Sequence, residues 1–107
     1  MKRVMVRYKV KPGRASENEQ FIKRVFDALD RKRPGGLHYT SLKLADGVSF
    51  VHIATHDASD GSNPLTSLPE FKAFTAGIKE RCEELPVSTE WTEVGAYDGA
   101  GVETAST

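Results

Sequence analysis

Residues 37–56 read LHYTSLKLADGVSFVHIATH, two β-rich runs on either side of the pair Asp46-Gly47. Asp-Gly is a strong signal for a tight hairpin turn, so we expect antiparallel strands over 37–44 and 48–56. With a two-residue turn, one face of this hairpin holds Leu42, Leu44, Val51 and Ile53, and the other holds Leu37, Tyr39, Val48, Phe50 and Ala54. Both faces are apolar, which indicates that both must be covered.

The segments before the hairpin predict a strand and a helix. Residues 4–10 alternate apolar and polar side chains, the period of a strand, and Pro12-Gly13 ends that pattern. Ser16 and Glu19 form a capping-box pattern, and apolar residues at helical spacing follow it. We therefore expect a helix over 17–33, ended by Pro34-Gly35-Gly36.

The segments after the hairpin predict a loop, a second helix and a last strand. Residues 57–66 are polar and rich in turn formers, and a loop of this length often borders a binding site. Ser67 and Glu70, with Pro69 between them, predict the start of a helix that continues to Leu85-Pro86 and carries Cys82 near its end. Residues 87–97 predict the last strand.

This order predicts an α+β, ferredoxin-like βαββαβ fold: a four-stranded antiparallel sheet with two helices on one face. We expect residues 1–97 to form a single domain and residues 98–107 to form a disordered tail. Because two helices cover only one face of the sheet, we expect the other face to pack against a second copy of the chain. The sequence thus predicts a homodimer through the sheet face.

Composition excludes several classes of partner. The 107 residues contain 15 Lys plus Arg and 15 Asp plus Glu, so a net charge of zero provides no field to gather nucleic acid. No apolar run approaches the roughly 20 residues that span a bilayer, and the start does not resemble a signal peptide. Cys82 is the single cysteine and has no internal disulfide partner. We therefore expect a cytoplasmic protein without nucleic-acid or membrane partners.

His52 and His56 are the candidate catalytic residues. They share a strand parity, which places their Cβ atoms about 13 Å apart and excludes one shared metal ion. His38 has the opposite parity, so the histidines form no ligand cluster and we expect no metal site. Each histidine of the pair is either an ordinary buried side chain or a proton carrier that lines a pocket.

Arg7, Tyr39 and Trp91 are the candidate substrate-binding residues. Trp91 either stacks on a flat ligand or fills a subunit interface, and Tyr39 has the same two interpretations. Arg7 either pairs with a carboxylate such as Glu90 or Glu93 or binds an anionic substrate oxygen. Asn18, on the apolar face of the first helix, needs a partner, and a local hydrogen bond is favoured over a catalytic role.

Three motifs and the hairpin together resemble the antibiotic biosynthesis monooxygenase superfamily over residues 3–97. The motifs are Val10-Lys11-Pro12-Gly13, Pro34-Gly35-Gly36 and the LPEFKAF segment at 68–74. The resemblance implies a dimeric α+β barrel, made when two sheets pack together. Some members oxidise aromatic polyketides without metal or flavin, some degrade haem, and many have no assigned reaction.

The resemblance also implies where chemistry would lie. Haem-degrading members have an asparagine on the first strand, where this chain has Val6 or Arg7, and a histidine near the position of Thr75, so we expect no haem and no other cofactor. Polyketide-oxidising members use an asparagine, a tryptophan and an arginine, and Trp91 and Arg7 supply two of these residue types.

Three functions remain open at this stage. The first is a cofactor-independent monooxygenase that acts on an aromatic or apolar metabolite, with the loop at 57–66 as the rim of its pocket. The second is a small-molecule binder without catalysis. The third is a structural dimer or accessory protein without a ligand.

Overall fold

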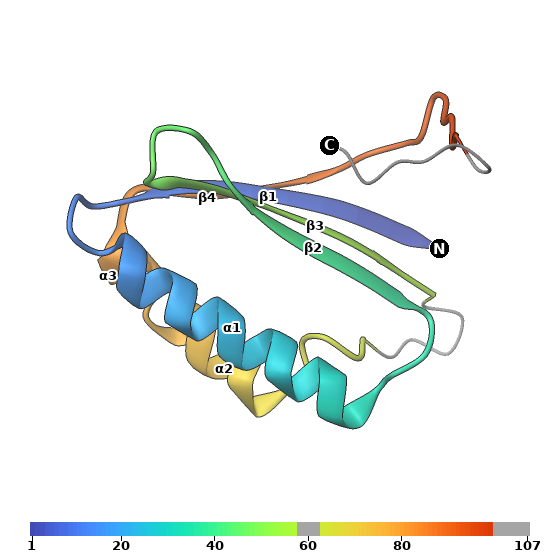
Figure 1. The fold of residues 1–107 in the computed structure, drawn as a ribbon, viewed down its shortest axis with the longest axis horizontal. Helices are drawn as coiled ribbons and strands as arrows, with labels where there is room; N and C mark the ends of the chain where they lie inside the picture. Colours follow the sequence, from blue (N-terminus) through green and yellow to red (C-terminus); the bar gives the residue numbers. More distant parts are fainter. Residues whose placement is uncertain (58–62, 100–107) are drawn as a thin grey trace.

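The computed structural model describes residues 1–57 and 63–99, and their helices and strands follow the expected order (Figure 1). The elements are β1 (Lys2–Val10), α1 (Ala15–Lys32), β2 (Leu37–Lys43), β3 (Ser49–His56), α2 (Pro69–Ala76), α3 (Ile78–Arg81) and β4 (Cys82–Glu90). The strands lie in the order β2-β3-β1-β4, and each neighbouring pair is antiparallel. The helices pack on one face of this sheet, which confirms the ferredoxin-like α+β fold.

The hairpin has the expected register. Leu42 pairs with Val51 and Lys43 with Phe50, as a turn centred on Asp46-Gly47 requires. The Asp46 carboxylate accepts hydrogen bonds from the Val48 and Ser49 backbone N–H groups at 3.0 and 2.8 Å and from the Ser49 hydroxyl at 2.6 Å. Gly47 has a φ of 78°, which favours glycine at this position of the turn. The register directs the even-numbered residues of β3 towards the helices.

The first helix begins earlier than expected, and its capping-box prediction is wrong. Ser16 lies inside the first turn, and the residue before the helix is Arg14, which makes no side-chain cap. The Arg14 N–H donates to the Lys11 carbonyl at 3.0 Å, and this turn leads the chain into the helix at Ala15. The Arg14 guanidinium pairs with Glu17 at 2.6 Å, so an ion pair takes the place of the expected cap.

The second helix is shorter than expected, and the predicted last strand is displaced. Helix α2 ends at Ala76, the four residues of α3 follow Gly77, and the chain is already extended at Cys82. The prediction of a helix to residue 85 is therefore wrong. Proline is tolerated in edge strands, and β4 is an edge strand of the sheet, so Pro86 lies within it rather than ending a helix.

Two expectations fall partly outside the described residues. Residues 100–107 of the expected tail are not described, and neither are residues 58–62 of the expected loop. The boundary at residue 97 stays a prediction.

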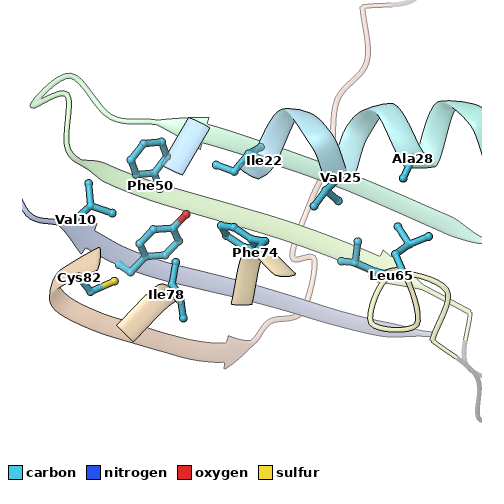
Figure 2. Close-up of a cluster of buried hydrophobic side chains, with 11 residues drawn as sticks. Val10, Ile22, Val25, Ala28, Phe50, Leu65, Phe74, Ile78 and Cys82 are labelled. Atoms are coloured by element: carbon cyan, nitrogen blue, oxygen red, sulfur yellow. The ribbon is translucent and has the colours of Figure 1, made fainter. Parts of the chain in front are cut away.

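The core lies between the sheet and the helices, as Figure 2 shows for labelled side chains of α1, β3 and the segments around them. Val10 and Phe50 come from the sheet, and Val25 and Phe74 from the helices. No helix in the described part of the chain has the length and apolar character needed to cross a bilayer.

The other face of the sheet is uncovered in a single chain. It is the face that carries Leu42, 44% exposed, and Val87, 64% exposed. Leu42 pairs with Val51 on β3, and Val87 pairs with Arg7 on β1, so apolar side chains lie on β2, β3 and β4 of this face with the exposed Arg7 between them.

Candidate functional site

A cavity of about 300 Å³ lies between the sheet and helix α2. One wall consists of the helix-facing side chains of the strands, and the other consists of α2 with residues near its start. Most of the lining is apolar and includes Val4, Val6, Leu37, Ala54, Phe71 and Phe74. Tyr8, Tyr39, His52 and His56 also line it. An apolar hollow with a few polar groups is the usual form of a small-molecule site.

His52 is the polar centre of the cavity wall. It is buried, and both of its ring nitrogens have partners: Nε2 lies 2.8 Å from the Tyr8 hydroxyl, and Nδ1 lies 2.8 Å from the Tyr39 hydroxyl and 2.7 Å from Ser41 Oγ. Burial lowers the pKa of His52 to about 4, because the charged imidazolium loses its water. The ring is therefore neutral at pH 7.

Two tyrosine rings enclose the imidazole. The Tyr8 and Tyr39 rings stack on His52 with centroids 5.4 and 5.8 Å away. Burial raises the pKa of Tyr8 well above its usual value and that of Tyr39 to about 12. Both phenols therefore keep their protons, and their hydroxyl groups are neutral hydrogen-bond partners of His52.

Asn18 and Arg81 lie behind Tyr8. The Asn18 amide Nδ2 donates to the Tyr8 hydroxyl at 2.8 Å, and Asn18 Oδ1 accepts from Arg81 Nε at 3.2 Å. Arg81 is 2% exposed, lies 4.5 Å from the centroid of the Phe21 ring, and donates from Nη2 to the Phe74 carbonyl at 2.8 Å. The expectation of a local hydrogen bond for Asn18 is wrong, because its partners come from β1 and α3.

His56 lies four residues further along β3, on the same face as His52. It is 6% exposed and lines the cavity, and its Nδ1 has no hydrogen-bond partner among the described residues. A buried nitrogen without a partner is rare in proteins and points to a ligand or a water molecule.

The other candidate residues lie away from this cavity. Arg7 is exposed and pairs with Val51 and Val87, which places it on the uncovered face of the sheet. Trp91 follows the end of β4, where its backbone N–H donates to the Arg3 carbonyl at 3.2 Å and its ring centroid lies 5.7 Å from the Arg3 guanidinium. The structure thus brings together Tyr39, His52 and His56, but neither Arg7 nor Trp91.

Sequence reasoning missed Tyr8, Ser41 and Arg81. Ser41 lies on the same face of β2 as Tyr39, and Tyr8 of β1 lies on the same face of the sheet as His52. The alternation of side chains along these strands could therefore have identified both residues. Arg81 gave no such signal, because the helix was expected to continue past it.

A metal ion or a haem needs side chains that can ligate the metal. Within 1–57 and 63–99, no three His, Cys, Asp or Glu side chains are arranged to hold a metal ion. Thr75 lines the cavity, and its hydroxyl donates to the Phe71 carbonyl at 3.1 Å. The expected absence of metal and haem stays a prediction.

Comparison with known proteins identifies the fold. No protein-family model matches the sequence, and no curated protein is significantly similar to it. An antibiotic biosynthesis monooxygenase of known structure is 14% identical, with a TM-score of 0.72 over 89% of this chain and 100% of its own. SnoaB, a cofactor-independent oxygenase from Streptomyces nogalater, is 21% identical, with a TM-score of 0.64 over 89% of this chain and 94% of its own.

A protein from Caulobacter crescentus with a provisional assignment to the same activity is 23% identical, with a TM-score of 0.68 over 88% of this chain and 90% of its own. The chain therefore shares the fold of the antibiotic biosynthesis monooxygenases, which confirms the resemblance at the level of the fold.

Proposed function

We propose that this chain is a cofactor-independent monooxygenase that oxidises a small aromatic hydroxyl compound held in the cavity. The observation that carries the proposal is the neutral, buried His52, held between two tyrosine hydroxyls in an otherwise apolar cavity. The fold shared with SnoaB, a cofactor-independent oxygenase, supports the same class of reaction. Fold alone does not assign a reaction, so the side chains carry the argument.

The cavity would favour the reactive form of the substrate. A flat phenol would replace water in the apolar lining and pack against Phe71 and Phe74. Its hydroxyl would donate to the Tyr8 oxygen while Tyr8 passes its own proton to His52 Nε2, 2.8 Å away. The phenolate and the imidazolium formed together attract each other, which raises the pKa of His52 in the complex above that in the empty cavity.

The reaction then needs only dioxygen. The phenolate carbon para to the oxygen gives electrons to dioxygen and bonds to it, and the peroxide anion takes the proton back from His52. The O–O bond then breaks as the para C–H loses its proton. One oxygen atom stays as the second carbonyl of a quinone, and the other leaves as water. The substrate supplies all the electrons, so the balance is phenol plus dioxygen to quinone plus water.

His56 and Tyr39 would orient the ligand. The unpartnered Nδ1 of His56 would bind a second polar group on the ligand. Tyr39 would contact the ligand through its ring, because its hydroxyl is engaged with His52 Nδ1. Arg7 and Trp91 do not line this cavity, so neither belongs to the proposed site.

Oxygen uptake with a panel of one- and two-ring phenols and quinols tests this function. We expect the wild type to consume oxygen with one of these compounds. The turnover rate should fall by about a hundredfold or more in His52→Ala, the usual effect of losing a general base. His56→Ala is expected to weaken binding without abolishing turnover. His38→Ala removes a histidine from the opposite face of the sheet and should change neither quantity. Equal turnover in His52→Ala and wild type would contradict the proposal.

Binding without catalysis is the second candidate function. It is favoured by the fact that both nitrogens of His52 already have protein partners. Fluorescence titration with the same phenols distinguishes the two functions, because a binder saturates with phenol and consumes no oxygen.

We also propose that the working form is a homodimer in which two sheets pack face to face. Support comes from the apolar side chains on the uncovered face, which include Met5, Leu42, Leu85 and Val87. Exposed apolar side chains gathered on one face are typical of a subunit interface.

A further inference from the structure

The hydrogen bonds around Asn18 have a single consistent direction. Arg81 has only donors to offer, so the Asn18 atom that faces Arg81 Nε at 3.2 Å must be the amide oxygen. The Asn18 NH₂ group therefore faces Tyr8 and donates to its hydroxyl oxygen at 2.8 Å. The buried cation thus settles the orientation of an amide that could otherwise take either of two orientations.

The direction continues to His52. Since Tyr8 accepts from Asn18, its own hydrogen needs another acceptor, and within the described residues the partner recorded for it is His52 Nε2 at 2.8 Å. A nitrogen that accepts a hydrogen bond carries no proton. In a neutral imidazole the proton then sits on Nδ1, which faces the hydroxyls of Tyr39 and Ser41 at 2.8 and 2.7 Å.

The opposite tautomer fits less well. With the proton on Nε2, Tyr8 would accept from both Asn18 and His52, and its own hydrogen would have no acceptor among the described residues. Only a molecule in the cavity that Tyr8 lines could take this hydrogen, whereas the Nδ1–H tautomer pairs it within the protein. Leaving a buried donor unpaired is unfavourable.

We propose that Arg81 and Asn18 are positioning residues that hold His52 in the Nδ1–H tautomer and keep the lone pair of Nε2 directed at the Tyr8 hydroxyl. The tautomer follows from the hydrogen bonds alone. Its use rests on the proposed function, because a proton that moves from a substrate through Tyr8 to Nε2 needs this direction of the chain. Neither residue touches the substrate.

Nitrogen NMR of protein labelled with ¹⁵N-histidine tests the tautomer directly. At pH 7 we expect the ¹⁵N chemical shift of His52 Nδ1 to be that of a protonated ring nitrogen and the shift of Nε2 to be that of an unprotonated one. The His52 signals are assigned by their loss in His52→Gln. A wild-type His52 with the proton on Nε2 would overturn the proposal whatever the variants do.

Asn18→Asp reverses the direction of the chain. The introduced carboxylate accepts from Arg81 and from the Tyr8 hydroxyl, so Tyr8 becomes an acceptor for His52 and the imidazole proton should move to Nε2. The matched control is Gln20→Glu, which adds the same charge at an exposed position of α1 and should leave the tautomer unchanged. A folded Asn18→Asp variant that keeps the Nδ1–H pattern would also overturn the proposal.

Arg81 is tested by a pair of variants. Arg81→Met removes the donor that orients Asn18, so the His52 shifts should move towards values averaged between the two tautomers. Arg81→Lys retains a cationic donor and should retain the wild-type pattern. Loss of the pattern in both variants to the same extent would show that burial and packing, rather than donation to Asn18, hold the tautomer.

Activity separates this inference from the proposed function. With a phenol substrate, Asn18→Asp should lower kcat by about tenfold or more and leave KM nearly unchanged, because the ligand does not touch position 18. If the tautomer reverses as expected and no variant, the wild type included, oxidises a phenol, the proposed function fails and the positioning role stands.

Discussion

The protonation of His52 links the site to the stability of the fold. Its pKa is lowered from 6.5 to about 4 in the folded chain by burial, so the folded state binds this proton less readily than the unfolded state. No stability is lost on this account above pH 6.5, where both states are neutral. Between pH 6.5 and 4 the unfolded state takes up the proton and the folded state does not, so stability falls as the pH falls.

We therefore predict that the free energy of unfolding drops on the order of 3 kcal/mol more between pH 7 and pH 4 in the wild type than in His52→Gln. Urea unfolding at several pH values across this range measures the free energy of unfolding of both proteins. Subtracting one from the other cancels the contribution of the other titrating groups. Parallel curves for the two proteins would contradict the lowered pKa.

The two tyrosine hydroxyls should differ in their effect on stability. Tyr8→Phe leaves both Asn18 Nδ2 and His52 Nε2 without their partner in a buried region, whereas Tyr39→Phe leaves Nδ1 with Ser41. We predict a loss of about 1–3 kcal/mol for Tyr8→Phe and about 1 kcal/mol or less for Tyr39→Phe. Urea unfolding at pH 7 ranks the two variants, and a larger loss for Tyr39→Phe would be inconsistent with the network.

The hairpin turn is the element in which local chemistry is strongest. Hydrogen bonds from Ser49 and from two backbone N–H groups lower the pKa of the Asp46 carboxyl to about 2. A carboxyl with a lowered pKa stabilises the fold above its unfolded pKa of 3.8, and that contribution is lost as the pH falls through 2.

We predict that Asp46→Asn melts a few degrees below the wild type at pH 7 and that the gap closes as the pH approaches 2. Thermal unfolding at several pH values gives the result. A gap that persists unchanged at low pH would mean that the charge of Asp46 contributes nothing to the turn.

The elements differ in how far the sequence predicted them, for physical reasons. The register of the β2–β3 hairpin was predictable because Asp46 and Gly47 act on their immediate neighbours. The break after α2 was not, because the residues of the stripe Phe71, Phe74, Ile78 and Cys82 keep helical spacing across Gly77. The chain leaves the helix there because Arg81 bonds back to Phe74 and its carbonyl accepts from Lys11 on a distant segment.

At the scale of the whole molecule, the site is built from parts of the chain that are far apart. Strand parity predicted that His52 and His56 share a face, and the structure shows that Tyr39 lies with them in the cavity wall. It could not predict the link from Arg81 through Asn18 to Tyr8, because Arg81 and Asn18 are 63 residues apart and meet only when α3 packs against α1. The buried partner of Asn18 was therefore beyond local reasoning.

The apolar side chains on the uncovered face of the sheet predict a homodimer. A homodimer through this face should bury well over roughly 1,000 Å² in total, so we expect light scattering at micromolar concentration to give the mass of two chains. Val87→Glu should yield a folded monomer, because residue 87 is exposed in the single chain and the charge would be buried only in the dimer. Ala73→Glu, an exposed position on α2, is the matched control and should remain dimeric. A wild-type monomer would remove the basis for this assembly.

The proposed reaction is tested most directly by a turnover under ¹⁸O₂ with the purified protein after dialysis against a chelator. A two-ring phenol with an open para position serves as the substrate, and mass spectrometry follows the quinone. We predict one labelled oxygen atom in each quinone formed, the second in water, and loss of the labelled product in His52→Ala. A quinone without label, or the same amount of labelled quinone from His52→Ala as from the wild type, would contradict the assignment of this cavity to a cofactor-independent monooxygenase.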